Sequence, residues 1–206
     1  GQQQASHTTE HIQSNFGMMK PEGYRKALRV MKLAEKFNLP IVTLIDTPGA
    51  DPGIGAEERG QGYAIAKNLF EMASIETQIL SVVIGEGASG GALGIGLCDK
   101  MIMLEHTWFS VISPEGCASI LWKDSTKAPE AADSLKLTPK DLMEHNICNS
   151  IVYEPSGGAH RHFDETADIL KDAILVEIKS MQESITKNYL DLRVERYDKL
   201  GVFRED

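Results

Sequence analysis

The feature that most constrains the fold of this chain is an apolar run followed directly by a glycine-rich segment. Residues 79–84 (ILSVVI) have the composition of a buried strand, and residues 85–98 (GEGASGGALGIGLC) contain six glycines. Because glycine has no Cβ, a ligand can approach the backbone of such a segment closely. We expect a strand, a tight turn and a helix whose first turn is Gly90-Gly91-Ala92. The N–H groups and the positive dipole end of that helix make the turn a candidate site for negative charge.

The segments before this turn predict a mostly parallel α/β sheet. Residues 21–38 have the periodicity of an amphipathic helix, residues 41–45 that of a strand buried on both faces, and residues 56–74 that of a second helix. Alternating helices and strands imply parallel strands with right-handed crossovers. Ligand-binding loops in such folds gather at the carboxyl ends of the strands. We therefore expect the loops at 46–55 and 85–91 to converge on one crevice.

The second half of the chain predicts shorter elements and one long terminal helix. Those elements are strands at 101–104, 108–112 and 150–153, a helix capped by Ser113 and begun by Pro114, and short helices near 129–134 and 139–145. From Asp164 to Ile185, apolar residues keep helical spacing over more than five turns. The length of 206 residues suits one domain, spanning 1–206.

Composition excludes several classes of function. The net charge of −9 argues against nonspecific nucleic-acid binding. No apolar run approaches the roughly 20 residues that span a bilayer, and the chain does not begin with a signal peptide, so we expect an intracellular protein. Cys98, Cys117 and Cys148 are far apart in the sequence. That spacing favours reduced, buried thiols over a disulfide framework or a zinc site.

A serine nucleophile is one alternative reading of the glycine-rich turn. Residues 87–91 satisfy the G-x-S-x-G pattern of a nucleophile elbow in a strand, turn and helix context, with Ser89 at its centre. A triad needs a histidine base and an acidic residue that orients it. The candidates in the chain order Ser, Asp, His are Asp99 or Asp124 with His145 or His160.

Other patterns are weaker. Asp46 to Gly49 fits the D-x-x-G element of GTP-binding proteins, but the G-x-x-x-x-G-K-[ST] phosphate loop is missing from the sequence. Glu86 and Glu115 could act as acid and base, although acidic residues early in a helix also complement its dipole. The histidines lack metal-ligand spacing. A site for a thioester or ureido oxyanion accounts for more of these sequence features than any other hypothesis. Gly90 and Gly91 would donate N–H groups to the oxyanion, and the Pro48-Gly49-Ala50 loop would form the other wall of the site.

Several stretches together resemble one family. They are residues 15–18 (NFGM), 21–29 (PEGYRKALR), 45–50 (IDTPGA), 55–61 (GAEERGQ), 84–95, 112–123 and 154–160 (EPSGGAH). In this order they resemble the carboxyltransferase α subunit of acetyl-coenzyme A carboxylase, of the multisubunit bacterial or plastid type. The resemblance implies a crotonase-like fold, a spiral of ββα units, here with a long C-terminal helix. It also implies transfer of a carboxyl group from carboxybiotin, held on a biotin carrier protein, to acetyl-coenzyme A to give malonyl-coenzyme A.

The resemblance also implies partners and site residues. The partners are a carboxyltransferase β subunit in an α2β2 assembly, the biotin carboxyl carrier protein and biotin carboxylase, in the cytoplasm or in a plastid stroma, with no metal on this chain. Gly90 and Gly91 would stabilise the negative charge on the biotin ureido oxygen, while the β subunit stabilises the thioester enolate. The implied cofactor-binding residues are Gly49, Ala50, Gly87 and Ala92. Since the ureido nitrogen can take the substrate's α proton, no protein nucleophile is required, and Ser89 is a turn residue.

The chain departs from the family pattern at three places. Gln2-Gln3-Gln4-Ala5 stands where the family has His-Gln-Lys-Gly, Asp51 stands where it has an aromatic residue, and Ala88-Ser89 after Gly87 stands for Gly-Gly-Ser. The family also has a helical segment upstream, which we expect this chain to lack. Two rivals remain: a noncatalytic crotonase-like scaffold subunit and a serine hydrolase that uses Ser89.

Overall fold

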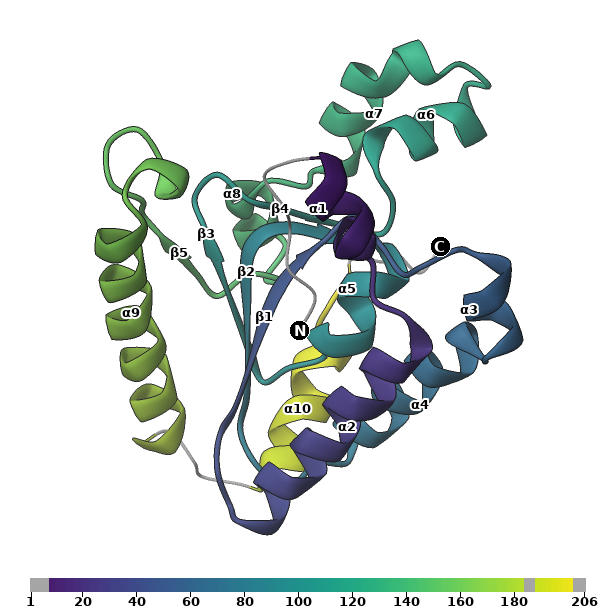
Figure 1. Ribbon diagram of the computed structural model, residues 1–206. Helices are drawn as coiled ribbons and strands as arrows, with labels where there is room; N and C mark the ends of the chain where they lie inside the picture. The colour runs from purple at the N-terminus through teal and green to yellow at the C-terminus, as the bar shows by residue number, and fades with distance from the viewer. Residues whose placement is uncertain (1–7, 184–187, 202–206) are drawn as a thin grey trace, which may run out of the picture.

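The structure is a computed structural model that describes residues 8–183 and 188–201. Within these ranges the strands form one sheet in which every pairing is parallel, with the order β1-β2-β3-β5 and with β4 paired to the end of β2 (Figure 1). The strands are β1 (Ile41–Thr47), β2 (Ile79–Ala88), β3 (Lys100–Leu104), β4 (Trp108–Ser110) and β5 (Ser150–Val152). The predicted parallel α/β sheet is therefore confirmed.

Helices cover the sheet on both faces. They are α1 (Thr8–Gln13), α2 (Pro21–Lys36), α3 (Ile54–Glu58), α4 (Gln61–Ala73), α5 (Ser89–Gly96), α6 (Pro114–Leu121), α7 (Ala128–Leu135), α8 (Pro139–Glu144), α9 (Phe163–Glu183) and α10 (Tyr189–Asp198). Helices α2, α4, α5 and α10 lie on one side of the sheet and α9 lies on the other, while α6 and α7 stand apart at one end (Figure 1). No helix in the described ranges combines the length and apolar composition needed to cross a membrane.

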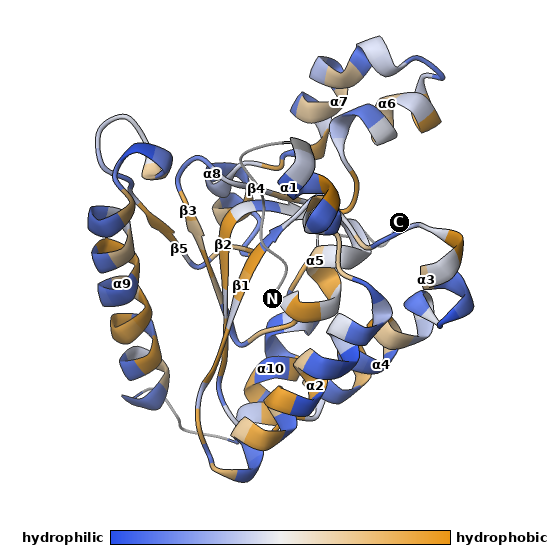
Figure 2. Ribbon diagram, viewed as in Figure 1, coloured by the Kyte–Doolittle hydropathy of each residue, from blue (hydrophilic) through white to orange (hydrophobic). Residues whose placement is uncertain are grey.

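Alternation along the central strands builds two cores. Ile79 and Val83 of β2 face a core with Ile45 of β1 and Met72 of α4. Their neighbours in β2, such as Leu80, face the other core, where α9 packs. Figure 2 shows the apolar side of α9 turned toward the sheet. Residues 79–83 of β2 are buried on both faces and are apolar except for Ser81, as expected for a central parallel strand.

The first strand corrects one prediction. We expected residues 41–45 to be buried on both faces, but Val42 is 38% and Leu44 is 52% exposed, while Ile45 is fully buried. Strand β1 is the edge of the described sheet. Helix α9 lies over the far strands and does not reach it (Figure 1). One face of β1 is therefore open.

The bounds of four elements also differ from the prediction. Strand β2 continues to Ala88, four residues beyond its expected end at Ile84, and leads straight into α5. The helix expected at 56–74 is two helices, since Gly60 takes a left-handed conformation (φ +80°) between α3 and α4. The long terminal helix ends at Glu183, and α10 follows it, capped by the Asn188 side chain. Ile185 lies outside the described residues. Strand β4 is shorter than expected, because residues 111 and 112 fall outside it.

Candidate functional site

The site begins where β2 passes into α5. Ser89 is exposed and has a positive φ of 59°, which turns the chain from the strand into the helix. Gly90 and Gly91 follow in the first turn of α5, and no side chain caps this helix at Ala88. The first four N–H groups of an α-helix have no partner within the helix. The backbone N–H groups of Gly90 and Gly91 are therefore available to an external acceptor.

The loop after β1 meets this turn at Gly91. A Cβ at Gly91 would overlap the carbonyl carbon of Gly49 and would lie 2.7 Å from the backbone nitrogen of Ala50. Such an approach between two backbones is open only to glycine. The predicted convergence of the two loops is thus confirmed.

Gly90 faces different surroundings. The nearest atom to a Cβ placed there is Cδ1 of Ile65, at 3.5 Å, which is an ordinary van der Waals distance. The residue is partly exposed, whereas Gly91 is buried. Gly90 therefore has room on its outer side for a ligand, and Gly91 is packed against the loop.

Hydrogen bonds hold the loop after β1 in place. The Thr47 hydroxyl accepts from the Gly49 N–H at 3.2 Å and lies 2.9 Å from the Gly17 carbonyl oxygen. Asp51 accepts from the Gly53 N–H at 2.8 Å and from the Asn15 amide at 3.1 Å. Asp51 departs from the family's aromatic residue, and here it ties the loop to the segment before α2. The departure at Gln2 and Gln4 lies outside the described residues.

The remaining predicted site residues, Gly87 and Ala92, are buried and flank the turn. The side chain of Ala92 is fully buried, so Ala92 can offer only its backbone N–H. Gly87 lies in β2, where it pairs with Phe109, and a Cβ there would be 2.6 Å from the Phe109 ring. The Phe109 ring occupies the space that a side chain at position 87 would need, and this packing is sufficient to explain the glycine there.

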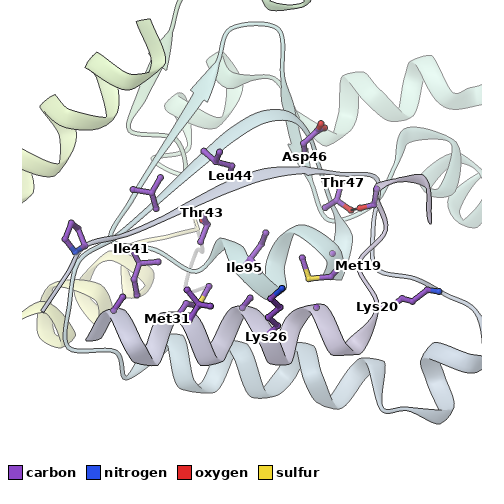
Figure 3. A pocket seen from close by; sticks show the side chains of 18 residues that line it. Met19, Lys20, Lys26, Met31, Ile41, Thr43, Leu44, Asp46, Thr47 and Ile95 are labelled. Carbon is purple, nitrogen blue, oxygen red and sulfur yellow. Dashed lines mark hydrogen bonds between the residues drawn. The ribbon is translucent and has the colours of Figure 1, made fainter. Parts of the chain in front are cut away.

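A groove of about 640 Å³ runs between α2 and the open edge of β1, and it reaches Thr47 and Gly91 (Figure 3). Its walls are largely apolar, and Lys26 projects into it from α2, as Figure 3 shows. Asp46 also borders it. The groove is thus an apolar channel that is lined by two cations, Lys20 and Lys26, and ends at the glycine turn.

The partners that a serine nucleophile needs are engaged elsewhere. Asp99 forms an ion pair with Arg193, with Nε and Oδ1 at 2.8 Å, and Asp124 accepts from the Thr126 N–H and hydroxyl. His145 and His160 are exposed, and no hydrogen bond in the described part of the chain joins either imidazole to Ser89. Ser89 has the backbone geometry of a nucleophile elbow, but the triad is not assembled.

The other acidic and metal-binding candidates are accounted for in similar terms. Glu115 is exposed in the first turn of α6, where it complements the helix dipole. The side chain of Asp46 fills the space beside Gly85 and accepts from the Glu86 N–H at 3.0 Å. Among the described residues, no three His, Cys, Asp or Glu side chains gather as a metal would require. The three cysteines are free and buried, as predicted.

Two residues that hold the site were not identified from the sequence. The Tyr24 hydroxyl donates to the Gly91 carbonyl at 3.2 Å, and the Asn68 amide donates to the Gly94 carbonyl at 3.0 Å. Both side chains are almost fully buried. Tyr24 is one of the apolar residues that recur with helical periodicity in residues 21–38, so the sequence indicated only that it packs in the core. For Asn68, the one signal in the sequence was a polar residue among the apolar residues of a predicted helix.

Comparison with known proteins gives a consistent result. A family model described as acetyl co-enzyme A carboxylase carboxyltransferase-like matches residues 1–201. The chain is 54% identical over 205 residues to the acetyl-coenzyme A carboxylase carboxyl transferase subunit alpha of Ruthia magnifica subsp. Calyptogena magnifica, and 55% identical to that of Methylococcus capsulatus. Each match covers 100% of this chain, but only 65% and 64% of the respective relative. The chain thus spans less than two thirds of their length.

Solved structures show the same fold at low sequence identity. A transcarboxylase 12S structure has a TM-score of 0.64 at 18% identity, and covers 92% of this chain and 33% of that chain. A Pseudomonas malonate decarboxylase hetero-tetramer in complex with coenzyme A has a TM-score of 0.65 at 14% identity, and covers 87% of this chain and 71% of that chain. The chain therefore shares its fold with a transcarboxylase and a malonate decarboxylase, and the predicted fold class is confirmed. By its family match and its fold, the chain belongs to the acetyl co-enzyme A carboxylase carboxyltransferase-like family.

Proposed function

We propose that this chain is a carboxyltransferase α subunit that carries a carboxyl group from biotin to acetyl-coenzyme A, giving malonyl-coenzyme A for fatty acid synthesis. The observation that carries the proposal is the convergence of the Gly90-Gly91 turn with the Gly49-Ala50 loop. The names of the relatives support the substrates, and the tight backbone packing supports a rigid site.

The residues present fit the ureido oxygen of biotin. An oxygen that gains negative charge needs N–H donors fixed in advance, and the uncapped start of α5 supplies them. Gly90 leaves space in front of those donors because it lacks a side chain. Carboxybiotin supplies the carboxyl group when bound. The N–H groups of Gly90 and Gly91 stabilise the charge on its oxygen, and one such donor typically contributes about 3 kcal/mol to lowering a barrier.

The Gly49-Ala50 loop has a supporting role in this proposal. It packs on Gly91 and so forms the opposite wall of the site. Gly87 and Ala92 lie behind the turn and are buried. No side chain of this chain needs to act as a nucleophile, so Ser89 only turns the backbone.

We further propose that the chain works with a carboxyltransferase β subunit in an α2β2 assembly, together with a biotin carboxyl carrier protein and biotin carboxylase, in the cytoplasm or a plastid stroma. The fold neighbour that is a hetero-tetramer supports assembly from two kinds of subunit. Exposed apolar side chains on α6 and just before it offer a surface for such a partner. They include Val111, Ile120 and Leu121, which are 78%, 68% and 68% exposed.

The proposal is tested by carboxylation of free biocytin from malonyl-coenzyme A, the reverse reaction, with the β subunit present. Gly90→Val places a branched side chain in front of the donors, so turnover should be abolished. Ser89→Ala is the matched control and should largely keep its activity. Loss of activity in Ser89→Ala alone, or labelling of Ser89 by a fluorophosphonate, would instead support a serine hydrolase. Unchanged turnover in both Gly90 and Gly91 variants would support a noncatalytic scaffold.

A further inference from the structure

Helix α5 has little stability of its own. Four of its eight residues are glycine, and each glycine costs roughly 1 kcal/mol relative to alanine in a helix interior. No side chain caps its start at Ala88. The direction in which the N–H groups of its first turn point is therefore set by contacts from neighbouring elements.

Tyr24 makes one of these contacts, at Gly91. It projects from α2, is fully buried, and its hydroxyl donates to the Gly91 carbonyl at 3.2 Å. Its ring packs one turn further along α5, where a Cβ on Gly94 would lie 2.7 Å from Cε1 of the ring. Burial raises the pKa of Tyr24 well above its usual range, so its hydroxyl stays protonated as a donor at neutral pH.

Gly91 is thus held from two sides. The backbone of Gly49 and Ala50 occupies the space that a Cβ of Gly91 would need, and the Tyr24 hydroxyl donates to its carbonyl oxygen. Glycine has more φ/ψ freedom than any other residue, so a contact at one point leaves the two peptide planes that meet at Gly91 poorly determined. The second contact, from Tyr24, limits rotation of the first turn.

We propose that Tyr24 is a positioning residue that keeps the Gly90 and Gly91 N–H groups aimed at the oxyanion, an inference that rests on the proposed function. Tyr24 does not touch the substrate. It acts through its hydrogen bond to the Gly91 carbonyl, and it affects how precisely the N–H groups of Gly90 and Gly91 are oriented. Donors held in advance act mainly on the transition state, so Tyr24 should affect kcat rather than KM.

Two other hydroxyl groups provide matched controls at the far end of α5. The Tyr197 hydroxyl accepts from the Cys98 N–H at 2.9 Å, just beyond the helix. The Ser81 hydroxyl is fully buried and lies 3.3 Å from the Gly96 carbonyl oxygen. Tyr197→Phe removes the same atom as Tyr24→Phe, and Ser81→Ala removes an equally buried donor. Neither control residue lies near the glycine turn.

The experiment compares Tyr24→Phe, Tyr197→Phe and Ser81→Ala in the complex with the β subunit. Tyr24→Phe should lower kcat roughly tenfold and leave KM for biocytin and malonyl-coenzyme A nearly unchanged, because a small misplacement of catalytic groups is costly. Both controls should keep the wild-type kcat. Amide hydrogen exchange should be faster over residues 89–92 in Tyr24→Phe than in either control.

The two readouts separate this inference from the proposed function. Absence of carboxyl transfer in the wild-type complex would refute the function, while hydrogen exchange would still test the hold of Tyr24 on α5. If the wild type is active and Tyr24→Phe keeps its kcat, the positioning role is wrong. An equal loss of kcat in Tyr197→Phe and Ser81→Ala would also overturn it, since general loosening of α5 would then explain the effect.

Discussion

Gly90 and Gly91 are adjacent in the sequence, but the space around them differs. A side chain on Gly91 would run into the backbone of Gly49 and Ala50, and backbone cannot move aside as a flexible side chain can. A side chain on Gly90 would meet only Ile65 at an ordinary distance. Gly91 is therefore required for packing, and Gly90 keeps space open at the site.

This difference predicts opposite effects of alanine on stability. Gly91→Ala should lower the free energy of unfolding by about 3 kcal/mol, the upper part of the usual cost of overpacking a core. Gly90→Ala should leave it nearly unchanged, since its methyl group finds space. Urea unfolding of the two variants measures the difference. Equal stability of the two variants would show that the loop does not press on Gly91.

At the scale of elements, α10 connects parts of the fold that are distant in the sequence. Arg193 is 2% exposed, and its five N–H donors all find acceptors. Two go to Asp99 after α5, and the others go to the carbonyls of Met72, Ile75 and Thr77 around the end of α4. Arg196 in the same helix donates to the Ile147 carbonyl before β5. One short helix thus ties together three helix-to-strand connections.

Replacement of Arg193 should therefore be costly. Arg193→Met leaves the Asp99 carboxylate without its cation in a nearly buried position, and breaking a buried pair in this way typically costs about 3–5 kcal/mol. Arg25→Met, which breaks an exposed pair with Glu22, is the control and should change stability far less. Thermal or urea unfolding gives the comparison. A small effect of Arg193→Met would mean that α10 contributes little to the fold.

At the scale of the whole molecule, Glu154 links two loops at the end of the sheet. Its carboxylate accepts from the Ala159 N–H at 2.7 Å and from the His106 N–H at 3.2 Å. Burial opposes ionisation of this side chain, but these hydrogen bonds and the nearby His106 imidazole outweigh it and lower the pKa of Glu154. The ionised carboxylate is therefore part of the folded state.

Acid should weaken the fold partly through this group. Because the folded pKa lies below the ordinary value of 4.5, the stabilisation is complete above that pH and is lost as the pH falls through the folded pKa. Glu154→Gln should flatten the fall of the unfolding free energy below about pH 4.5. Exposed Glu144→Gln should not. Urea titrations from pH 3 to 7 test this, and identical pH profiles for Glu154→Gln and the wild type would contradict it.

Much of the fold followed from local patterns. The apolar composition of residues 79–84 identified the central strand, Ser113 and Pro114 marked the start of α6, and the glycines at 90 and 91 marked the turn at the site. Each of these signals depends on residues that are close in the sequence. Composition and periodicity report such local preferences well, and the family resemblance named the chemistry that they serve.

The tertiary structure decided what distant segments do to one another. Gly91 needs its glycine because residues 49 and 50 lie against it, and Tyr24 reaches its carbonyl from 67 positions away. The open face of β1 depends on where α9 lies, and α10 has its role because Arg193 and Arg196 together find acceptors in three separate connections. A local sequence pattern cannot predict these contacts, because they join residues that are distant in the sequence and form only when the chain folds. The sequence by itself thus determined the strands and the glycine turn, and only the tertiary structure decided what holds that turn in position.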